Sequence, residues 1–263
     1  MQKIRWLLVG SILALAVIAY LTWPDGKVRV VFCNVGQGDG ILITQNNFQM
    51  VIDSGPDNRA MLGCLEKYLP FWDKEIEAAI MTHWDTDHSG GLKSLMDNYK
   101  IDKLYSSGPP TEVNVQKIYT SNLAINDIVR YGEINFEILN PDEDWGNDND
   151  NSIVGILSYR DNKILLMGDV TAGVEQKLVW RKILEGNGFK PFRTILKVSH
   201  HGSAAATSEE LLAAVRPAEA VISVGKNNFG HPTKVVLDRL KTTGVKIRRT
   251  DVEGDVLYVL PSH

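Results

Sequence analysis

The sequence predicts an α/β layered domain, because short apolar strands alternate with amphipathic helices along most of its 263 residues. A hydrophobic content of 44% is ample for a sizeable core, in one large domain or two small ones. Histidine and aspartate recur directly after apolar strands, near residues 83–88, 169 and 200–201. Ligand sites of layered α/β folds gather at such strand ends, so we expect a functional site there.

The first 23 residues differ from the rest of the chain. Lys3 and Arg5 precede eighteen uncharged residues, 6–23, with tryptophan at both ends. That length just crosses a bilayer, and tryptophan suits both of its interfaces. We therefore expect residues 1–23 to be an uncleaved signal anchor in a single-pass protein of the cytoplasmic membrane, with residues 24–263 outside the cytoplasm. The alternative is a signal peptide cleaved near 17–19, which would leave a secreted domain.

The first strands of the domain surround a Gly-rich turn. Residues 27–33, 41–44 and 48–52 are expected strands, the turn covers 34–40, and a helix follows at 59–69. The turn has neither the Lys-Ser/Thr pair nor the helix of a phosphate-binding loop, so we interpret it as backbone that approaches a neighbouring site. Asp39 in this turn and Asp53 at the end of the third strand could each simply cap a turn.

The densest group of potential ligands follows an apolar strand at 76–82. His83, Asp85, Asp87 and His88 stand within six residues, before a helix expected at 89–99. Packing these groups together is costly unless a cation lies among them, and neutral imidazole and ionised carboxylate are ligands of divalent metals. We therefore predict a metal-binding turn at 83–88 rather than an exposed acidic turn with two incidental histidines.

The second part of the chain has a comparable pattern. Asp169 follows a hairpin, and His200 and His201 follow a strand expected at 194–199. Because side chains alternate along a strand, we expect these two imidazoles to face opposite ways, one toward metal and the other toward substrate or a carboxylate. Two β-rich halves meeting near residue 130 are predicted, with helices outside. The remaining expected elements are strands at 102–105, within 113–139, at 153–158, 163–167, 220–224, 245–249 and 255–260, and helices at 172–184 and 233–242.

Charge and cysteine content add weaker constraints. The net charge is −4, but residues 177–249 hold 14 basic and 5 acidic side chains. Such a basic segment can attract an anionic substrate, including a nucleic acid. Cys33 and Cys64 could pair in an exported protein or remain as buried free thiols.

His83-x-Asp85-x-Asp87-His88, followed by Gly90-Gly91, resembles the signature of the metallo-β-lactamase superfamily, with aspartate where a second histidine is usual. Further motifs occur in the order found in the extracytoplasmic hydrolase domain of the ComEC family of competence proteins. They lie at 35–39, 52–55, 151–154, 167–169, 196–203 and 229–232. The resemblance covers residues 27–260. It implies one hydrolase domain over 24–263, folded as an αββα four-layer sandwich and preceded by the transmembrane helix.

The resemblance also implies roles for individual residues. His83 and Asp85 would hold a first divalent metal, Asp87 and His88 a second, and Asp169 would bridge the two. His201, or else His200, would complete the second site. Asp53 would orient the ligand turn. Asn151 and Ser152 stand where the superfamily usually has another histidine, so the first site is rich in oxygen ligands, which favours Mn²⁺ over Zn²⁺.

The function implied is that of a metal-dependent phosphodiesterase or nuclease acting on a phosphodiester such as single-stranded DNA. Two metal ions would activate water at Asp87 and its neighbours, His231 or His200 would stabilise or protonate the leaving oxygen, and Lys197 would contact substrate. His231 could instead shape its loop, Lys197 could form a structural ion pair, and Asn151 could only close the acidic loop. Competing functions are an envelope esterase of the phosphorylcholine esterase or lactonase type, and a non-catalytic DNA-binding competence module.

Overall fold

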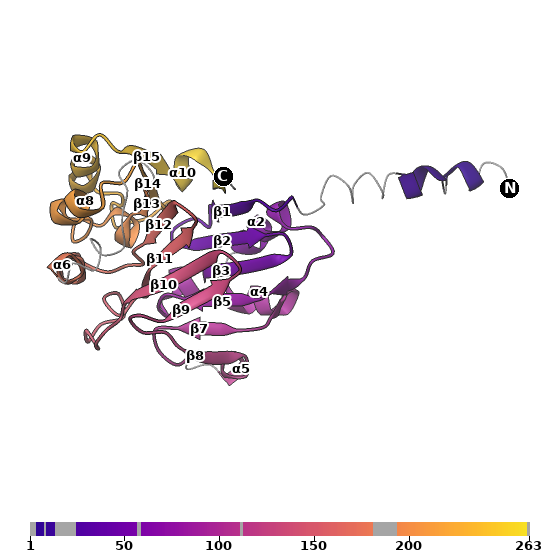
Figure 1. Ribbon diagram of the computed structural model, residues 1–263, viewed down its shortest axis with the longest axis horizontal. Coiled ribbons are helices and arrows are strands. Elements are labelled where there is room, and N and C mark those ends of the chain that lie inside the picture. Colours follow the sequence, from indigo (N-terminus) through magenta and orange to yellow (C-terminus); the bar gives the residue numbers. More distant parts are fainter. Residues whose placement is uncertain are drawn as a thin grey trace.

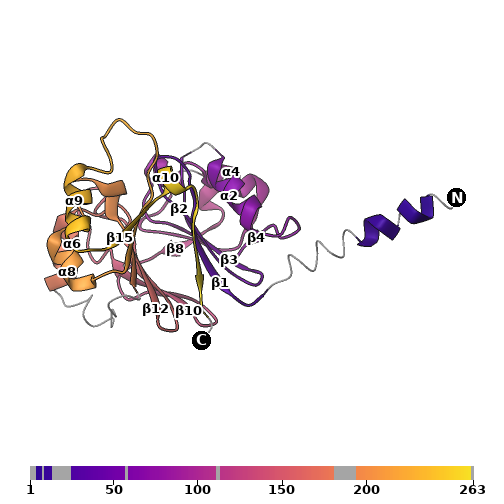
Figure 2. The same cartoon turned by 90° about the horizontal axis from the view of Figure 1, so that it is seen from above.

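The computed structural model describes residues 4–7, 9–13, 25–56, 59–110, 113–180 and 194–261. Two seven-stranded sheets lie face to face, and helices cover their outer faces (Figures 1 and 2). This arrangement is the predicted αββα sandwich. Both sheets are mixed, with antiparallel strands on one side and parallel strands on the other.

The first sheet has the strand order β16-β1-β2-β3-β5-β7-β8. Strands β16 to β3 are antiparallel neighbours, whereas β3, β5, β7 and β8 are parallel. The bounds are β1 (Val28–Phe32), β2 (Gly40–Gln45), β3 (Phe48–Ser54), β5 (Ala78–Met81), β7 (Leu104–Ser106), β8 (Tyr119–Asn122) and β16 (Val256–Leu260).

The second sheet has the order β15-β14-β13-β12-β11-β10-β9, with β12 to β15 parallel. Its bounds are β9 (Ile128–Tyr131), β10 (Ile134–Asn140), β11 (Val154–Tyr159), β12 (Asn162–Leu166), β13 (Thr194–Lys197), β14 (Glu219–Ile222) and β15 (Lys246–Arg249). A small parallel pair joins β4 (Glu75–Ile76) to β6 (Lys100–Ile101).

The helices form the two outer layers and the turns at the sheet ends. Their bounds are α2 (Ala60–Tyr68), α3 (Thr86–Ser89), α4 (Leu92–Asn98), α5 (Val113–Gln116), α6 (Ala172–Trp180), α8 (Glu209–Val215), α9 (Lys234–Thr242) and α10 (Thr250–Glu253), with a 3-10 turn, η1 (Ser199–Gly202). Figure 2 shows α2 and α4 on one side of the sheets and α6, α8 and α9 on the other.

Alternating side chains explain why the sheets are buried on both faces. In β2, Ile41 and Ile43 join the core between the sheets, whereas Leu42 packs in the core beneath α2 and α4. In β12, Leu166 faces the inter-sheet core and Leu165 the core beneath α6, α8 and α9. Strands buried on both faces read as continuous apolar runs, which is how these segments appear in the sequence.

Several expected elements differ from the observed ones. The helix expected at 89–99 is observed as α4 over 92–98, and the expected ligand turn contains the short helix α3. Residues 113–116, in a segment expected to be strands, form the helix α5. The short α8 and α10 were not predicted. The two predicted β-rich halves correspond to the two sheets, because the first half ends with β8 at Asn122 and the second begins with β9 at Ile128. The exception is β16, which follows the second half in the chain and pairs with β1.

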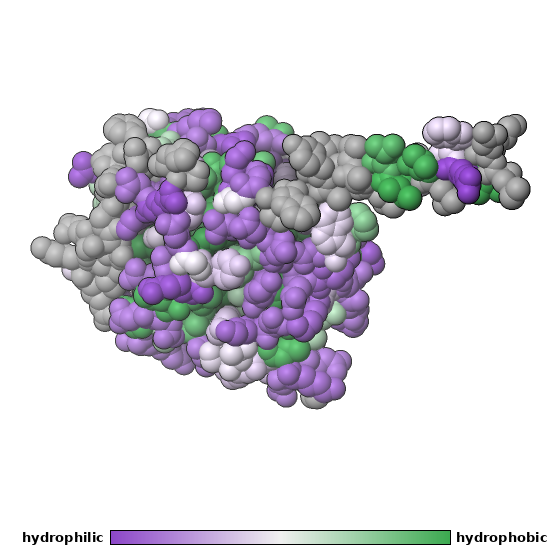
Figure 3. All heavy atoms as spheres, turned by 45° about the vertical axis from the view of Figure 1, so that its right-hand side comes forward, coloured by the Kyte–Doolittle hydropathy of each residue, from purple (hydrophilic) through white to green (hydrophobic). Residues whose placement is uncertain are grey.

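The predicted single-pass membrane location is contradicted. None of the helices in the described ranges combines the length and the apolarity that crossing a bilayer requires. Residues 4–7 and 9–13 are helical and project from the domain, with exposed apolar side chains (Figures 1 and 3). Residues 14–23 of the expected anchor, and 181–184 of the expected helix at 172–184, lie outside the described residues.

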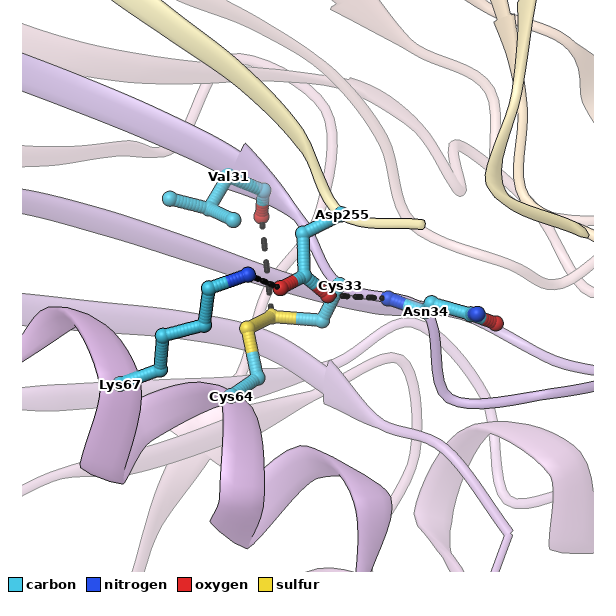
Figure 4. Close-up of a disulfide and its surroundings, with 6 residues drawn as sticks. All are labelled: Val31, Cys33, Asn34, Cys64, Lys67 and Asp255. Carbon is cyan, nitrogen blue, oxygen red and sulfur yellow. Dashed lines mark hydrogen bonds and ion pairs between the residues drawn. A yellow bond between two sulfur atoms is a disulfide. The ribbon is translucent and has the colours of Figure 1, made fainter. Parts of the chain in front are cut away.

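Cys33 and Cys64 form a disulfide, which settles the alternative left open by the sequence. It joins the end of β1 to α2 and is buried in the core beneath that helix. Next to it, Asp255 accepts hydrogen bonds from Lys67 Nζ and from the backbone N–H of Asn34 (Figure 4). The start of the Gly-rich turn is therefore fixed covalently on one side and by Asp255 on the other.

Candidate metal centre

Loops from both sheets bring the predicted site residues together at one edge. His83 to His88 follow β5, Asp169 follows β12, and His200 and His201 lie in η1 after β13. Asp39 lies in the Gly-rich turn between β1 and β2. Possible ligand atoms form four groups, and within each group the atoms lie within 4.8 Å of one another: His83, His88 and Asp169; Asp87, His88 and His201; Asp39, Asp169 and His201; and Asp39, Asp53 and His88.

His88 is held by Asp53, the residue predicted to orient the ligand turn. Nδ1 of His88 lies 2.8 Å from Asp53 Oδ2. Asp53 also accepts hydrogen bonds from the backbone N–H and the hydroxyl of Thr82, each at 2.7 Å. With Nδ1 donating to the carboxylate, Nε2 of His88 presents its lone pair toward Asp169, 3.3 Å away.

His83 and His201 are oriented in the same manner. His201 Nδ1 donates to the carbonyl oxygen of Ser223 at 2.9 Å, which leaves Nε2 facing Asp87 and Asp169, both at 3.3 Å. His83 Nδ1 lies 3.1 Å from the Thr82 hydroxyl. That hydroxyl donates its proton to Asp53, so it accepts from His83, and Nε2 of His83 also keeps its lone pair.

Ser152 connects the two halves of the site. Its hydroxyl lies 3.3 Å from His83 Nδ1 and accepts the backbone N–H of Asp169 at 3.2 Å. It therefore supports both residues, in line with the position expected for it. Asn151 instead accepts the backbone N–H of Trp145 and donates to Asp144, so it closes the acidic loop.

The sequence predicts mainly a turn-capping role for Asp39, but the structure places this residue inside the site. It is 2% exposed, its carboxylate pairs with Lys197, and Oδ1 lies 3.6 Å from His201 Nδ1. Its backbone N–H donates to the carbonyl oxygen of Asp87 at 3.1 Å. A Cβ on Gly38 would lie 2.0 Å from that oxygen, so the glycine allows this close approach, as interpreted for the turn.

Lys197 does not occupy the substrate-facing position predicted for it. Its side chain is 1% exposed, pairs with Asp39 and donates to the carbonyl oxygen of Gly168. Its Nζ also lies 3.8 Å from Asp169 Oδ1. These contacts agree with the alternative interpretation of Lys197 as part of a structural ion pair. The buried carboxylates require a neighbouring positive charge.

The two adjacent histidines both face Asp169, contrary to the expectation that they face opposite ways. The Nε2 atoms of His200 and His201 lie 3.8 Å and 3.3 Å from Asp169 Oδ2. The strand ends at Lys197, and both histidines adopt left-handed backbone conformations, with φ of 48° and 53°. Strand alternation therefore does not apply to them. His200 remains partly exposed, whereas His201 is buried.

The donor atoms fit a divalent cation. Within the described part of the chain, Nε2 of His83, His88 and His201 and Oδ1 of Asp169 are buried without a hydrogen-bond partner. Buried polar atoms normally have partners, and imidazole lone pairs beside carboxylates are the groups that divalent metals bind. Asp85, 3.6 Å from His83 Nε2 and half exposed, lies at the rim of the cluster.

The electrostatics of the site agree with this interpretation. Burial lowers the pKa of His201, but Asp169, Asp87 and Asp39 raise it to about 9. Burial likewise opposes protonation of His88, yet Asp169 and Asp53 hold its pKa well above the usual range. The carboxylates thus draw protons onto the imidazoles, and a metal ion competes with those protons for the same nitrogen atoms.

A cavity of about 410 Å³ adjoins the centre beside His83 and Trp84. Its wall carries the acidic loop, with Asp142, Glu143, Asp144 and Asp148. A larger cavity of about 720 Å³, lined by Phe48, Lys103 and Tyr131 among others, contains none of the predicted site residues.

The basic segment predicted at 177–249 is largely neutralised where the structure describes it. Lys246, Arg248 and Arg249 pair with Glu219, Glu253 and Asp251. Lys177 pairs with Asp142 and Glu143. The described basic side chains therefore give little support for a continuous anionic-substrate surface.

The fold and the His/Asp cluster define a metallohydrolase-like class. The sequence profile of the Metallo-beta-lactamase superfamily matches residues 33–226, and the chain belongs to this superfamily. It is 28% identical to ComE operon protein 3 of Bacillus subtilis (strain 168) over 264 residues, covering 89% of this chain and 33% of that protein. It is 30% identical to Recombination protein 2 of Haemophilus influenzae, covering 95% of this chain and 30% of that protein.

Competence protein ComA of Neisseria gonorrhoeae is 26% identical, with 90% of this chain and 33% of that protein covered. The chain thus spans about a third of the length of these curated relatives. Among solved structures, YhfI of Bacillus subtilis has a TM-score of 0.62 at 11% identity, covering 89% of this chain and all of that one. A diphosphatase of the PhnP family has a TM-score of 0.51 at 12% identity, covering 89% and 99%. These likenesses show the fold alone.

Proposed function

We propose that the chain is a metal-dependent phosphodiester hydrolase. The observation that carries this proposal is the convergence of three buried imidazole Nε2 atoms and an Asp169 oxygen without hydrogen-bond partners. His83, His88 and Asp169 would hold one divalent ion, and His201, Asp87, Asp169 or Asp39 a second, with Mn²⁺ and Zn²⁺ as candidates. Such ions polarise a phosphoryl oxygen and lower the pKa of bound water.

The residues of the chain have distinct roles in this proposal. Asp53, Thr82, Ser152 and the Ser223 carbonyl orient the ligands, so that little reorganisation is needed during the reaction. Lys197 partly neutralises the surplus of carboxylates. His200 and His231, whose rings lie 5.5 Å apart, stand at the accessible side of Asp169 and can donate hydrogen bonds to the leaving oxygen.

DNA is the phosphodiester favoured by the names of the relatives, which include a recombination protein and a competence protein. A second candidate is a small phosphodiester with a cationic leaving group. The acidic cavity beside His83 favours that candidate, because its carboxylates attract a cation and repel additional phosphates.

The proposal is tested by hydrolysis of bis-p-nitrophenyl phosphate and of end-labelled single-stranded DNA. Chelated protein is reconstituted with Mn²⁺ or Zn²⁺, with Asp169→Ala as the site variant and Asp97→Ala as the matched surface control. We expect metal-dependent cleavage of both substrates, lost in Asp169→Ala and retained in the control. Cleavage of the small ester alone supports the second candidate, and no cleavage with either metal contradicts the proposed hydrolase.

A further inference from the structure

Phe229 is an exposed aromatic side chain beside the candidate metal centre. It lies in the loop between β14 and α9, which rises above the edge of the sheets (Figure 2). The ring is 72% exposed. Single exposed apolar side chains are common on protein surfaces. The exposure of Phe229 therefore indicates a function only together with the residues around it.

Three rings lead from Asp169 outward to Phe229. His200 Nε2 lies 3.8 Å from Asp169 Oδ2, and its ring centroid is 5.5 Å from that of His231. The Phe229 ring lies 5.8 Å from the His231 ring, with an angle of 33° between the two planes. Phe229 therefore stands on the His200 side of the centre, with the His200 and His231 rings between it and Asp169.

The loop that carries Phe229 is fixed by its own hydrogen bonds. The Asn227 side chain accepts the backbone N–H groups of Phe229 and His231, both at 3.0 Å, and donates to the carbonyl oxygens of Gly225 and His231. Thr233 donates twice to the Gly202 carbonyl oxygen. Because the backbone is already ordered, a ligand that stacks on the ring does not have to order the loop.

The side of the centre near Phe229 differs in charge from the side near His83. The cavity beside His83 is lined by Asp142, Glu143, Asp144 and Asp148, which disfavour a second phosphate. Between Ser223 and Thr233 the sequence contains Lys226 and no acidic residue. The Phe229 loop lacks the carboxylates that repel a second phosphate in the cavity beside His83, so a phosphodiester chain meets less repulsion on this side. The planar group adjacent to a phosphodiester in such a chain is a nucleobase.

We propose that Phe229 forms a stacking subsite for an unpaired nucleobase next to the scissile phosphate. This proposal rests on the proposed phosphodiester hydrolase and assigns single-stranded nucleic acid as its substrate class. Aromatic side chains that stack on bases contribute without regard to sequence, since every base has a flat face. The subsite thus predicts a requirement for bases but no strong sequence preference.

The test compares binding of oligothymidylate with binding of an abasic oligomer of equal length. The abasic strand keeps the phosphates and lacks every base. Affinities are measured by fluorescence anisotropy on the chelated full chain, so that no turnover occurs. The variants are Phe229→Ala, Phe229→Trp and Phe71→Ala. Phe71 is a matched control because it is a similarly exposed phenylalanine, 67% against 72%, at the opposite end of β5 from the ligand turn.

We expect Phe229→Ala to weaken oligothymidylate binding by about tenfold and to leave binding of the abasic oligomer unchanged. Phe229→Trp should retain the affinity, and Phe71→Ala should behave as wild type. An equal loss on both strands, or no loss on either, overturns the subsite. Turnover of bis-p-nitrophenyl phosphate by the metal-loaded protein is measured in parallel. Base-dependent binding without that turnover overturns the proposed hydrolase and supports the base subsite. Turnover without base-dependent binding supports the hydrolase and overturns the base subsite.

Discussion

Asp53 Oδ2 lies 2.8 Å from Nδ1 of His88, although 35 residues separate them in the chain. Both side chains are buried, and Asp53 has a left-handed backbone conformation with φ of 57°. The carboxylate, at the end of β3, therefore sets the direction of a candidate metal ligand that lies in α3. The effect of the Asp53 carboxylate on metal binding can be tested by substitution with asparagine. This change does not disturb the backbone, because asparagine also accepts positive φ.

Asp53→Asn is expected to lower metal affinity by about 10–100-fold, since such hydrogen-bonding partners orient the ligand and raise its basicity. Isothermal titration of chelated protein with Mn²⁺ or Zn²⁺ measures this affinity. Asp97→Asn, on the exposed surface of α4, is the control and should bind metal as the wild type does. An unchanged affinity in Asp53→Asn would show that the hydrogen bond does not orient His88 for metal.

Metal removal should destabilise the domain, because the five aspartates of the cluster then keep only Lys197 and the imidazoles as positive partners. A ligand at about 100 times its Kd adds about 2.7 kcal/mol, and a domain of this size shifts by about 2–4 °C per kcal/mol. We expect chelation to lower Tm by roughly 5–10 °C in calorimetry. In the Asp169→Asn variant, chelation should lower the Tm only slightly. If chelation lowers the Tm of the variant and of the wild type equally, that result counts against this site.

Lys197→Met is predicted to destabilise the metal-free protein by about 3–5 kcal/mol, the usual cost of leaving a buried charge without its partner. Asp39 would then lose its buried ion pair, and Asp169 would lose a positive charge 3.8 Å away. Urea unfolding measures the difference. Lys234→Met removes an exposed pair with Asp238 and should cost at most about 1 kcal/mol. Equal effects of the two substitutions would refute the role assigned to Lys197.

Loss of the Cys33–Cys64 disulfide should reduce stability by about 3–4 kcal/mol, because it closes a loop with a sequence separation of 31. The double substitution Cys33→Ser and Cys64→Ser, unfolded in urea beside oxidised wild type, measures this. Reduced wild type should match the double variant. If the double variant is as stable as the oxidised wild type, the disulfide does not stabilise the fold.

Local patterns in the sequence were sufficient for much of the fold and for the main site residues. The run 83–88, Asp169 and His201 could be found because each follows an apolar strand, and those strands end at the same edge. The alternation of apolar strands with helices likewise predicted the layered α/β class. Whether these side chains bind metal stays a prediction.

Contacts between distant segments could not be predicted in this way. Asp39 enters the site because its turn packs against Asp87, and Lys197 turns inward because Asp39 is there. Neither contact has a local pattern. The direction of His200 depends on a left-handed turn at a non-glycine residue, which sequence propensity does not favour. The membrane anchor was expected from the uncharged run 6–23 and the basic residues before it, but the described ranges contain no helix with the length and apolarity to cross a bilayer.

The pairing of β16 with β1 has a consequence for the order of folding during synthesis. The register joins Val28 to Leu260 and Phe32 to Val256, so the edge of the first sheet is completed by almost the last described residues. Until the ribosome has released them, β1 presents an open hydrogen-bonding edge that could pair with another chain. This edge is therefore protected only after residues 256–260 have emerged from the ribosome, and pairing between such distant segments is slow.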